Sequence, residues 1–255
     1  MPKYSQVFLA DKEICARIAA GLDDAPFDRL VEVGPGGGAL TEFLFPKYGP
    51  RMKAVEIDSS LLPALRARFP GLEVVNQDFL DADLAALAGP GLAAFIGNLP
   101  YECSTAILEK VLFYEGFGTA IFMFQREVAR RITAAPGDSD YGGLSVVTAA
   151  RASAELLLDV KAASFSPVPA VESSVLVFKP RLYFPEKKRE DAFRALVKKA
   201  FSHRRKTLVN SLALCGIPKE AAAAAVQKCG LKPTARAQEL SLESYAVLTA
   251  ELGGA

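Results

Sequence analysis

Four consecutive residues, Asn98, Leu99, Pro100 and Tyr101, combine side chains that could act together on an amine. The Asn98 side chain and a nearby backbone carbonyl can both accept hydrogen bonds from an exocyclic amine. Two acceptors that hold both protons favour a pyramidal nitrogen, whose lone pair is then free to attack. Pro100 fixes φ and stiffens the segment, and Tyr101 offers a flat face on which a flipped base can stack. A simple proline turn that ends a strand is the alternative for the tetrapeptide alone.

The surrounding sequence places this tetrapeptide at the carboxyl end of a strand. An apolar run at 92–96 predicts a strand directly before it, and a helical pattern follows at 104–114. Open α/β sheets bind their ligands at the carboxyl ends of their strands. Apolar runs predict the other strands at 30–33, 52–57, 72–75, 119–124, 154–160 and 173–178.

A glycine-rich turn follows the first of these strands. It runs from Gly34 to Gly38 and precedes a helical pattern at about 39–47. Glycines let the backbone approach a ligand closely, so the strand, turn and helix predict a nucleotide-binding opening. The spacing is not the G-x-G-x-x-G fingerprint, and Pro35 removes a backbone donor. A tight β–α connection without a ligand is the alternative.

Acidic residues follow the next two strands. Glu56 lies 22 residues beyond Gly34, close to where an acid binds ribose hydroxyls in doubly wound folds. Asp58 competes for that role. Asp78 could accept a hydrogen bond from an adenine amine, and Phe79 could lie against the ring. Acids at successive strand ends, in register with a glycine turn, favour a binding site over solvated loops.

Composition limits the class of protein. The 255 residues, 51% of them apolar, fit one large domain or one domain with a small second one. No apolar run reaches the roughly 18 residues of a membrane span, and the first residues lack the pattern of a signal peptide. The four scattered cysteines fit a reducing cytosol and argue against zinc or a disulfide framework. We therefore expect a cytoplasmic protein without a metal site.

Positive charge is concentrated near the C-terminus although the whole chain carries only +1. Residues 187–236 hold eight lysines and five arginines against three acids, a net of +10, which suggests a polyanionic partner. Strand patterns stop at about residue 180, and helical patterns follow at 189–201, 206–214, 219–229 and 241–251. The basic residues Arg204, Arg205 and Lys206 separate the first two helices and are expected to contact phosphates. A solvated surface is the alternative.

With these residues assembled, the chain resembles the ribosomal RNA adenine N6,N6-dimethyltransferase family, which modifies two adjacent adenosines near the 3′ end of small-subunit RNA. Many motifs in the same order carry the resemblance. They are Gln6-x-Phe8-Leu9, Val31-Glu32-Val33-Gly34-Pro35-Gly36, Glu56-Ile57-Asp58, Asp78, Asn98-Leu99-Pro100-Tyr101-x-x-Ser104-Thr105, Gln125-x-Glu127-Val128, Tyr141-Gly142-x-Leu144-Ser145-Val146, Phe165-x-Pro167-x-Pro169-x-Val171-x-Ser173 and Phe201-x-x-Arg204-Arg205-Lys206-Thr207.

The resemblance implies a fold and a reaction. The fold is a Rossmann-like, seven-stranded class I methyltransferase sheet (α/β) over residues 1–180, with a small all-helical RNA-binding domain at 187–255. S-adenosyl-L-methionine is the implied methyl donor, and an immature small-subunit particle is the implied partner of a monomeric enzyme. The implied catalytic residues are Asn98, Leu99, Pro100, Tyr101 and Phe165, with Phe165 covering the base. The implied cofactor-binding residues are Val7, Leu9, Glu32, Gly34, Gly36, Glu56, Ile57, Asp78, Phe79 and Asn98.

The chain departs from the family pattern at three positions. Val7 replaces the usual Asn or His, so a contact there would come from the backbone. Glu102 replaces a common Asn, and Ala170 replaces a usual Lys. Three alternative functions remain: a non-catalytic ribosome-assembly or RNA-binding relative, an antibiotic-resistance methyltransferase acting on large-subunit RNA, and a nicotinamide dehydrogenase. The last lacks the fingerprint spacing.

Overall fold

The computed structural model describes residues 7–253, so Gln6 of the first motif lies outside the described residues. The chain divides into two compact units. The first comprises the described residues up to Ala129 together with Ser153–Pro180. The second comprises Arg130–Ala152 together with the described residues from Arg181 onward.

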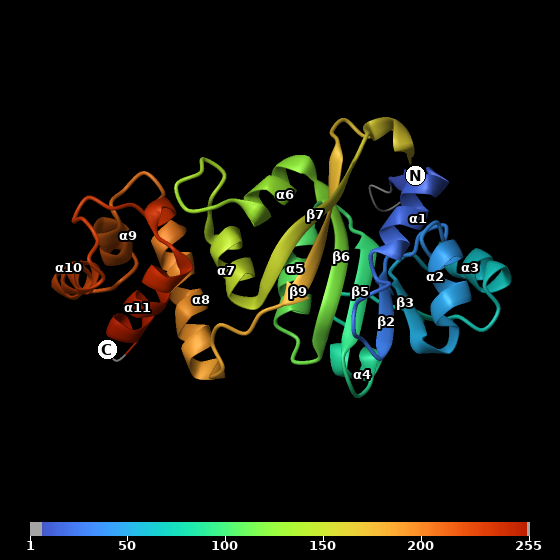
Figure 1. Cartoon of the computed structure of the whole chain (residues 1–255), viewed down its shortest axis with the longest axis horizontal. Helices are drawn as coiled ribbons and strands as arrows, with labels where there is room; N and C mark the ends of the chain where they lie inside the picture. The colour runs from blue at the N-terminus through green and yellow to red at the C-terminus, as the bar shows by residue number, and fades with distance from the viewer. Residues whose placement is uncertain (1–6, 254–255) are drawn as a thin grey trace. The chain divides into compact units, whose positions relative to one another are not determined.

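The first unit is built on a seven-stranded sheet (Figure 1). The strand order is β4-β3-β2-β5-β6-β9-β7. Neighbouring strands from β4 to β6 are parallel, and β9 is antiparallel to β6. The strands are β2 (Arg29–Val33), β3 (Met52–Glu56), β4 (Glu73–Asn76), β5 (Ala93–Asn98), β6 (Phe117–Gln125), β7 (Ala152–Val160) and β9 (Ser173–Pro180). The predicted seven-stranded α/β sheet is confirmed.

A second, two-stranded sheet pairs distant parts of the first unit. Strand β1 (Phe8–Leu9) is antiparallel to β8 (Phe165–Ser166), with Leu9 opposite Phe165. The pairing fixes the position of residues just before the first helix.

Helices account for most of the remaining chain. They are α1 (Lys12–Ala20), α2 (Thr41–Tyr48), α3 (Leu62–Arg68), α4 (Leu84–Ala88), α5 (Ser104–Leu112), α6 (Arg126–Thr133), α7 (Gly143–Arg151), α8 (Lys187–Phe201), α9 (Leu208–Leu214), α10 (Lys219–Lys228) and α11 (Leu242–Leu252). Asp11 caps α1, because its carboxylate accepts from the backbone N–H groups of Glu13 and Ile14. Within the described residues, no helix is long and apolar enough to cross a membrane.

Alternation along the central strand explains how both faces of the sheet are covered. Successive residues of a strand point to opposite faces. Ile96 belongs to the core that includes Ile18 of α1 and Leu44 of α2. Phe95 points the other way, where its ring lies 6.3 Å from Phe79 and 6.0 Å from Tyr114. All four residues Ala93 to Ile96 are fully buried, as expected of a strand covered on both faces.

The second unit has its own hydrophobic core. Tyr141, Val146 and Ala150 belong to the same buried cluster as Phe193 and Tyr245 of the C-terminal helices. Residues 130–152 therefore pack with those helices, whereas the sequence had assigned them to the methyltransferase domain. The reason is that their apolar positions complete a core which α8 to α11 share with α7.

The sheet order creates a crevice between β2 and β5. The chain leaves β2 through α2 toward β3 on one side, and it leaves β5 through α5 toward β6 on the other. A crevice at such a reversal is where open α/β sheets bind ligands. Gly97 sits at this point, and a Cβ atom there would come within 2.4 Å of the Val33 carbonyl oxygen. The close approach of the two strands therefore requires glycine.

Replacing Gly97 by alanine is expected to lower the free energy of unfolding by about 2 to 3 kcal/mol, because the new methyl group meets a backbone oxygen that cannot rotate away. Gly37→Ala is the matched control, since nothing lies within 4 Å of a Cβ at that position. Urea denaturation followed by circular dichroism measures both variants. Equal stability of the two would contradict the close approach.

Candidate active site

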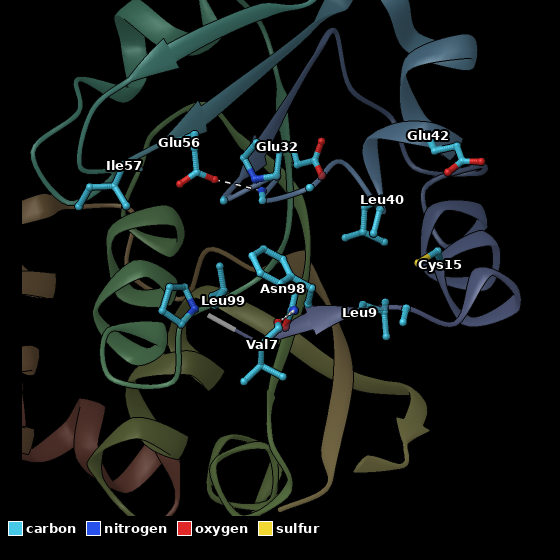
Figure 2. Close-up of a pocket in the computed structure, with 18 of the residues that line it drawn as sticks. Val7, Leu9, Cys15, Glu32, Leu40, Glu42, Glu56, Ile57, Asn98 and Leu99 are labelled. Atoms are coloured by element: carbon cyan, nitrogen blue, oxygen red, sulfur yellow. Dashed lines mark hydrogen bonds between the residues drawn. The ribbon is translucent and has the colours of Figure 1, made fainter. Parts of the chain in front are cut away.

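A cavity of about 380 Å³ opens at the crevice between β2 and β5. Its volume is within the range of small-molecule sites. Most of the sequence-predicted site residues line it: Val7, Leu9, Glu32, Gly34, Gly36, Glu56, Ile57, Asn98, Leu99, Pro100 and Tyr101. Figure 2 shows Glu56 and Ile57 on one side of this cavity and Glu42 on the other, with Glu32 and Asn98 between them.

The glycine turn bends sharply after β2. Gly34 has φ +67° and Gly36 has φ +55°, the left-handed region that favours glycine. A Cβ atom at Gly36 would also come within 2.9 Å of the Phe8 ring. Phe8 therefore packs directly against the turn at Gly36, whereas nothing lies within 4 Å of a Cβ atom at Gly34, where the turn leaves space for a ligand.

Glu56 ties this turn to the end of β3. Its Oε2 accepts from the Gly36 N–H at 3.0 Å, and its Oε1 accepts from the Asp58 N–H at 2.9 Å (Figure 2). The Glu56 side chain is buried, yet each carboxylate oxygen retains acceptor capacity. It is thus held rigidly at the cavity wall, in the position predicted for a group that binds ribose hydroxyls.

Glu32 is a second buried carboxyl group at the cavity wall. It is 1% exposed, and its Oε2 accepts from the Thr41 hydroxyl at 2.7 Å. Burial raises the pKa of Glu32 to about 7, and the charge of Glu56 adds to this increase. Two buried acids side by side make the cavity favourable for a positively charged ligand.

Asn98 is oriented by the N-terminal segment. Its Nδ2 donates to the Val7 backbone carbonyl at 3.0 Å (Figure 2). Because Val7 presents an acceptor, the amide must turn its NH₂ group toward it. The Asn98 oxygen therefore remains as an acceptor for a ligand. Val7 thus contributes its backbone carbonyl to the orientation of Asn98, while a backbone contact from Val7 to the cofactor stays a prediction.

Tyr101 is held at both its backbone and its ring. The Ser104 hydroxyl donates to the Tyr101 carbonyl at 3.1 Å. The Tyr101 hydroxyl lies 3.0 Å from the Ser173 hydroxyl. The ring lines the cavity and is half-buried, which leaves a face for stacking.

Three predicted site residues do not line the cavity. The Asp78 carboxylate accepts from the Leu80 N–H at 2.8 Å. The Phe79 ring is buried against Phe95, so a ligand contact at this position would come from the backbone. Phe165 is 3% exposed and packs in the core beside β1, so its ring is not free to cover a base. Both rings are buried among apolar residues and are not available to a ligand.

The sequence analysis missed an ion-pair cluster at the cavity rim. Lys12 pairs with Glu42 at 2.9 Å, and Arg68 also pairs with Glu42. Arg68 donates in addition to the Gly37 carbonyl at 2.8 Å. These residues come from α1, α2 and α3, which no local sequence pattern relates. Phe8 was also missed as a wall residue, although it stood in a quoted motif.

The cysteines near the cavity are not arranged for nucleophilic chemistry. Burial raises the pKa of the Cys15 thiol to about 11, and burial also raises the pKa of Cys103. Thiolates, the reactive form, are therefore disfavoured at both positions. Among residues 7–253, no group of three potential ligands could hold a metal ion.

The predicted phosphate-contacting residues divide into two kinds. Arg204 donates to the carbonyls of Ser139 (3.2 Å) and Tyr141 (2.9 Å). It therefore holds the loop before α7. The Gly137 N–H, bonded to the Gln238 carbonyl at 2.9 Å, also anchors this loop. Arg205 and Lys206 are exposed.

Sheet order, crevice and glycine turn define a class I methyltransferase. A crystal structure of a dimethyladenosine transferase from Plasmodium falciparum is similar in fold, with a TM-score of 0.82 at 22% identity over 97% of this chain and 98% of that one. Residues 1–252 match the family model described as ribosomal RNA adenine dimethylase. The chain therefore belongs to the ribosomal RNA adenine dimethylase family.

Two similar proteins match this chain over nearly its whole length. The ribosomal RNA small subunit methyltransferase A of Geobacter metallireducens is 42% identical, over 96% of this chain and 92% of its own length. The crystal structure of the 23S rRNA methyltransferase ErmE has a TM-score of 0.72 at 30% identity, over 96% of this chain and 99% of that one. The family and the fold imply S-adenosyl-L-methionine as the methyl donor.

The cavity residues fit this donor. It carries a ribose, for which Glu56 is placed, and a sulfonium and an ammonium group, which buried acids favour. The glycine turn leaves the space that a bulky ligand needs.

The raised pKa of Glu32 makes a pH-dependent prediction. The folded protein binds this proton more tightly than the unfolded chain, so stability falls as the pH rises from about 4.5 to about 7 and then levels off. Glu32→Gln has no carboxyl group to ionise and so avoids this fall in stability. At pH 8 its free energy of unfolding is expected to exceed that of the wild type by on the order of 2 to 3 kcal/mol.

Urea denaturation at pH 5, 6, 7 and 8 checks this expectation. Glu42→Gln is the control, because hydrogen bonding to Lys12 lowers the pKa of Glu42 and keeps its titration below this range. Parallel pH profiles for the wild type and Glu32→Gln would show that Glu32 ionises normally.

Proposed function

We propose that this enzyme methylates the N6 amines of two adjacent adenosines near the 3′ end of small-subunit ribosomal RNA. The product is N6,N6-dimethyladenosine, and the substrate is RNA in an immature small-subunit particle. A cytoplasmic monomer fits this role. The curated relatives support the target, because small-subunit enzymes reach 42% identity whereas ErmE, named for 23S rRNA, reaches 30%.

The observation that carries the proposal is the orientation of Asn98. Its NH₂ group is engaged by the Val7 carbonyl, so its oxygen is the group left to accept a proton of the target amine. The Leu99 carbonyl is the second acceptor that we assign to this amine. Holding both protons concentrates the lone pair on the nitrogen. Tyr101 stacks on the base and presents the amine to these acceptors.

Bound S-adenosyl-L-methionine supplies an electrophilic methyl group. Glu56 would hold its ribose and the turn at Gly34 its methionine part, and the adenine amine is assigned to Asp78, whose side chain is not part of the cavity wall. No residue needs to act as general base, because the methylated amine is acidic and loses its proton to solvent. Catalysis by this chain is then a matter of orientation and of fixed acceptors.

Methyl transfer from labelled S-adenosyl-L-methionine tests the proposal. The substrates are small-subunit particles that lack the modification, with large subunits as the control. Label recovered as dimethyladenosine in the small-subunit RNA alone supports it. Label in the large subunit would favour the resistance-enzyme alternative, and cofactor binding without transfer would favour a non-catalytic assembly factor.

Asn98→Ala is expected to lower methyl transfer by at least about 100-fold, because it removes an acceptor whose position is fixed before the amine arrives. Folding should be unaffected, since Asn98 is only partly buried. Single-turnover kinetics on particles measures the rate, and the thermal unfolding midpoint is the control. Near-normal turnover would remove Asn98 from the mechanism.

The basic residues of the second unit allow a contrast between neighbours. Neutralising Arg205 and Lys206 together is expected to weaken particle binding and to reduce the salt slope of log K by about 2, since each phosphate contact releases counterions. Arg204→Gln is instead expected to increase amide hydrogen exchange in residues 135–141, whose carbonyls it holds.

Binding titrations at several salt concentrations and hydrogen-exchange mass spectrometry measure these effects. An unchanged salt slope in the double variant would mean that Arg205 and Lys206 do not contact RNA. Wild-type exchange of the 135–141 loop in Arg204→Gln would mean that the loop is held without this side chain.

A further inference from the structure

Tyr101 is fixed in a way that the reaction alone does not require. Stacking on a base needs only an aromatic ring, yet the hydroxyl of Tyr101 lies 3.0 Å from the Ser173 hydroxyl. The backbone of the same residue is held separately by Ser104. The phenol contact therefore adds a constraint on the ring itself.

Ser173 is a rigid point from which to hold a ring. It is 0% exposed, begins β9, and lies opposite Gln125 at the end of β6. The preceding residue, Glu172, accepts from the Arg126 N–H at 3.0 Å and forms an ion pair with the Arg126 side chain. Ser173 thus cannot follow a movement of the Tyr101 ring.

We propose that Ser173 is a positioning residue for the target base. Its hydroxyl holds the far end of the Tyr101 ring in place, so that an adenine stacked on the ring has its N6 amine directed at the Asn98 oxygen. This inference rests on the proposed function, because it takes the stacked ligand to be an adenine.

The physical basis is the point at which the contact acts on the ring. The phenol oxygen lies on the axis about which the ring rotates, at the end farthest from the backbone, so a hydrogen bond there opposes swinging of the whole ring about the Cα–Cβ bond. A stacked base follows the plane of the ring, and a small tilt moves an amine at its edge away from a fixed acceptor. Misplacement of a reacting group by about 1 Å can cost up to 100-fold in rate.

Two variants remove the same contact from opposite ends: Ser173→Ala and Tyr101→Phe. Ser174→Ala is the matched control, because Ser174 is also buried but donates to Asp159 at 2.6 Å rather than to Tyr101. The phenylalanine variant keeps the stacking face and guards against a folding defect in Ser173→Ala. Unfolding midpoints are measured for all three.

The first readout needs no substrate. The protein is labelled with ring-¹³C tyrosine, and the Tyr101 signal among the seven tyrosines is assigned by its loss in Tyr101→Phe. NMR relaxation is expected to show a more mobile Tyr101 ring in Ser173→Ala and a wild-type ring in Ser174→Ala. An equally ordered ring in Ser173→Ala would overturn the proposal whatever the substrate.

The second readout is single-turnover methyl transfer to small-subunit particles at saturating cofactor. Ser173→Ala and Tyr101→Phe are each expected to be about 3- to 10-fold slower than the wild type, as for loss of one hydrogen bond. The double variant is expected to be no slower than the slower single variant, because both lose one contact. Cofactor affinity, measured by calorimetry, should not change.

Losses that multiply in the double variant, or an equal loss in Ser174→Ala, would overturn the positioning role. Failure of the wild type to methylate particles would count against the proposed function instead, while the NMR result would still decide whether Ser173 holds the ring.

Discussion

One hydrogen bond, from Asn98 Nδ2 to the Val7 carbonyl, determines what the cavity can do. An amide side chain can present either a donor or an acceptor, and only a fixed partner decides which. The partner here comes from a segment 91 residues away in the sequence. The pairing of β1 with β8 holds that segment in place. The small two-stranded sheet is therefore part of the chemical site, although none of its residues needs a reactive side chain.

The buried acids show a conflict between stability and function. Glu32 and Glu56 are both almost inaccessible to solvent, and burial together with the charge of Glu56 raises the pKa of Glu32. Glu56 offsets its burial by accepting two backbone N–H bonds, which also shape the glycine turn. Glu32 accepts a hydrogen bond from the Thr41 hydroxyl, and its pKa is nevertheless raised. A cationic ligand favours the ionised form of Glu32, so the folded chain holds a destabilising arrangement that binding relieves.

Sequence patterns were sufficient for the sheet and for the residues at its strand ends. Apolar runs located the strands, and the glycine turn with Glu56 located the crevice. The direction in which an individual ring points could not be predicted from these patterns, because Phe79 and Phe165 lie next to site residues yet point into the core. The rim cluster of Lys12, Glu42 and Arg68 depends on how three helices meet. The sequence does not distinguish Arg204 from its basic neighbours, because its hydrogen bonds to two loop carbonyls depend on the fold.

The departures from the family pattern become understandable from these contacts. At position 7 the structure uses a backbone carbonyl, which every residue possesses, so valine preserves the orientation of Asn98. Glu102 and Ala170 are exposed, and no contact of either positions Asn98 or Tyr101 in the interactions described above. A backbone carbonyl remains when the side chain at its position changes, whereas the acceptor that we propose at Asn98 is a side-chain oxygen that substitution removes. We therefore expect position 7 to accept other residues and position 98 not to, although both lie at the same cavity.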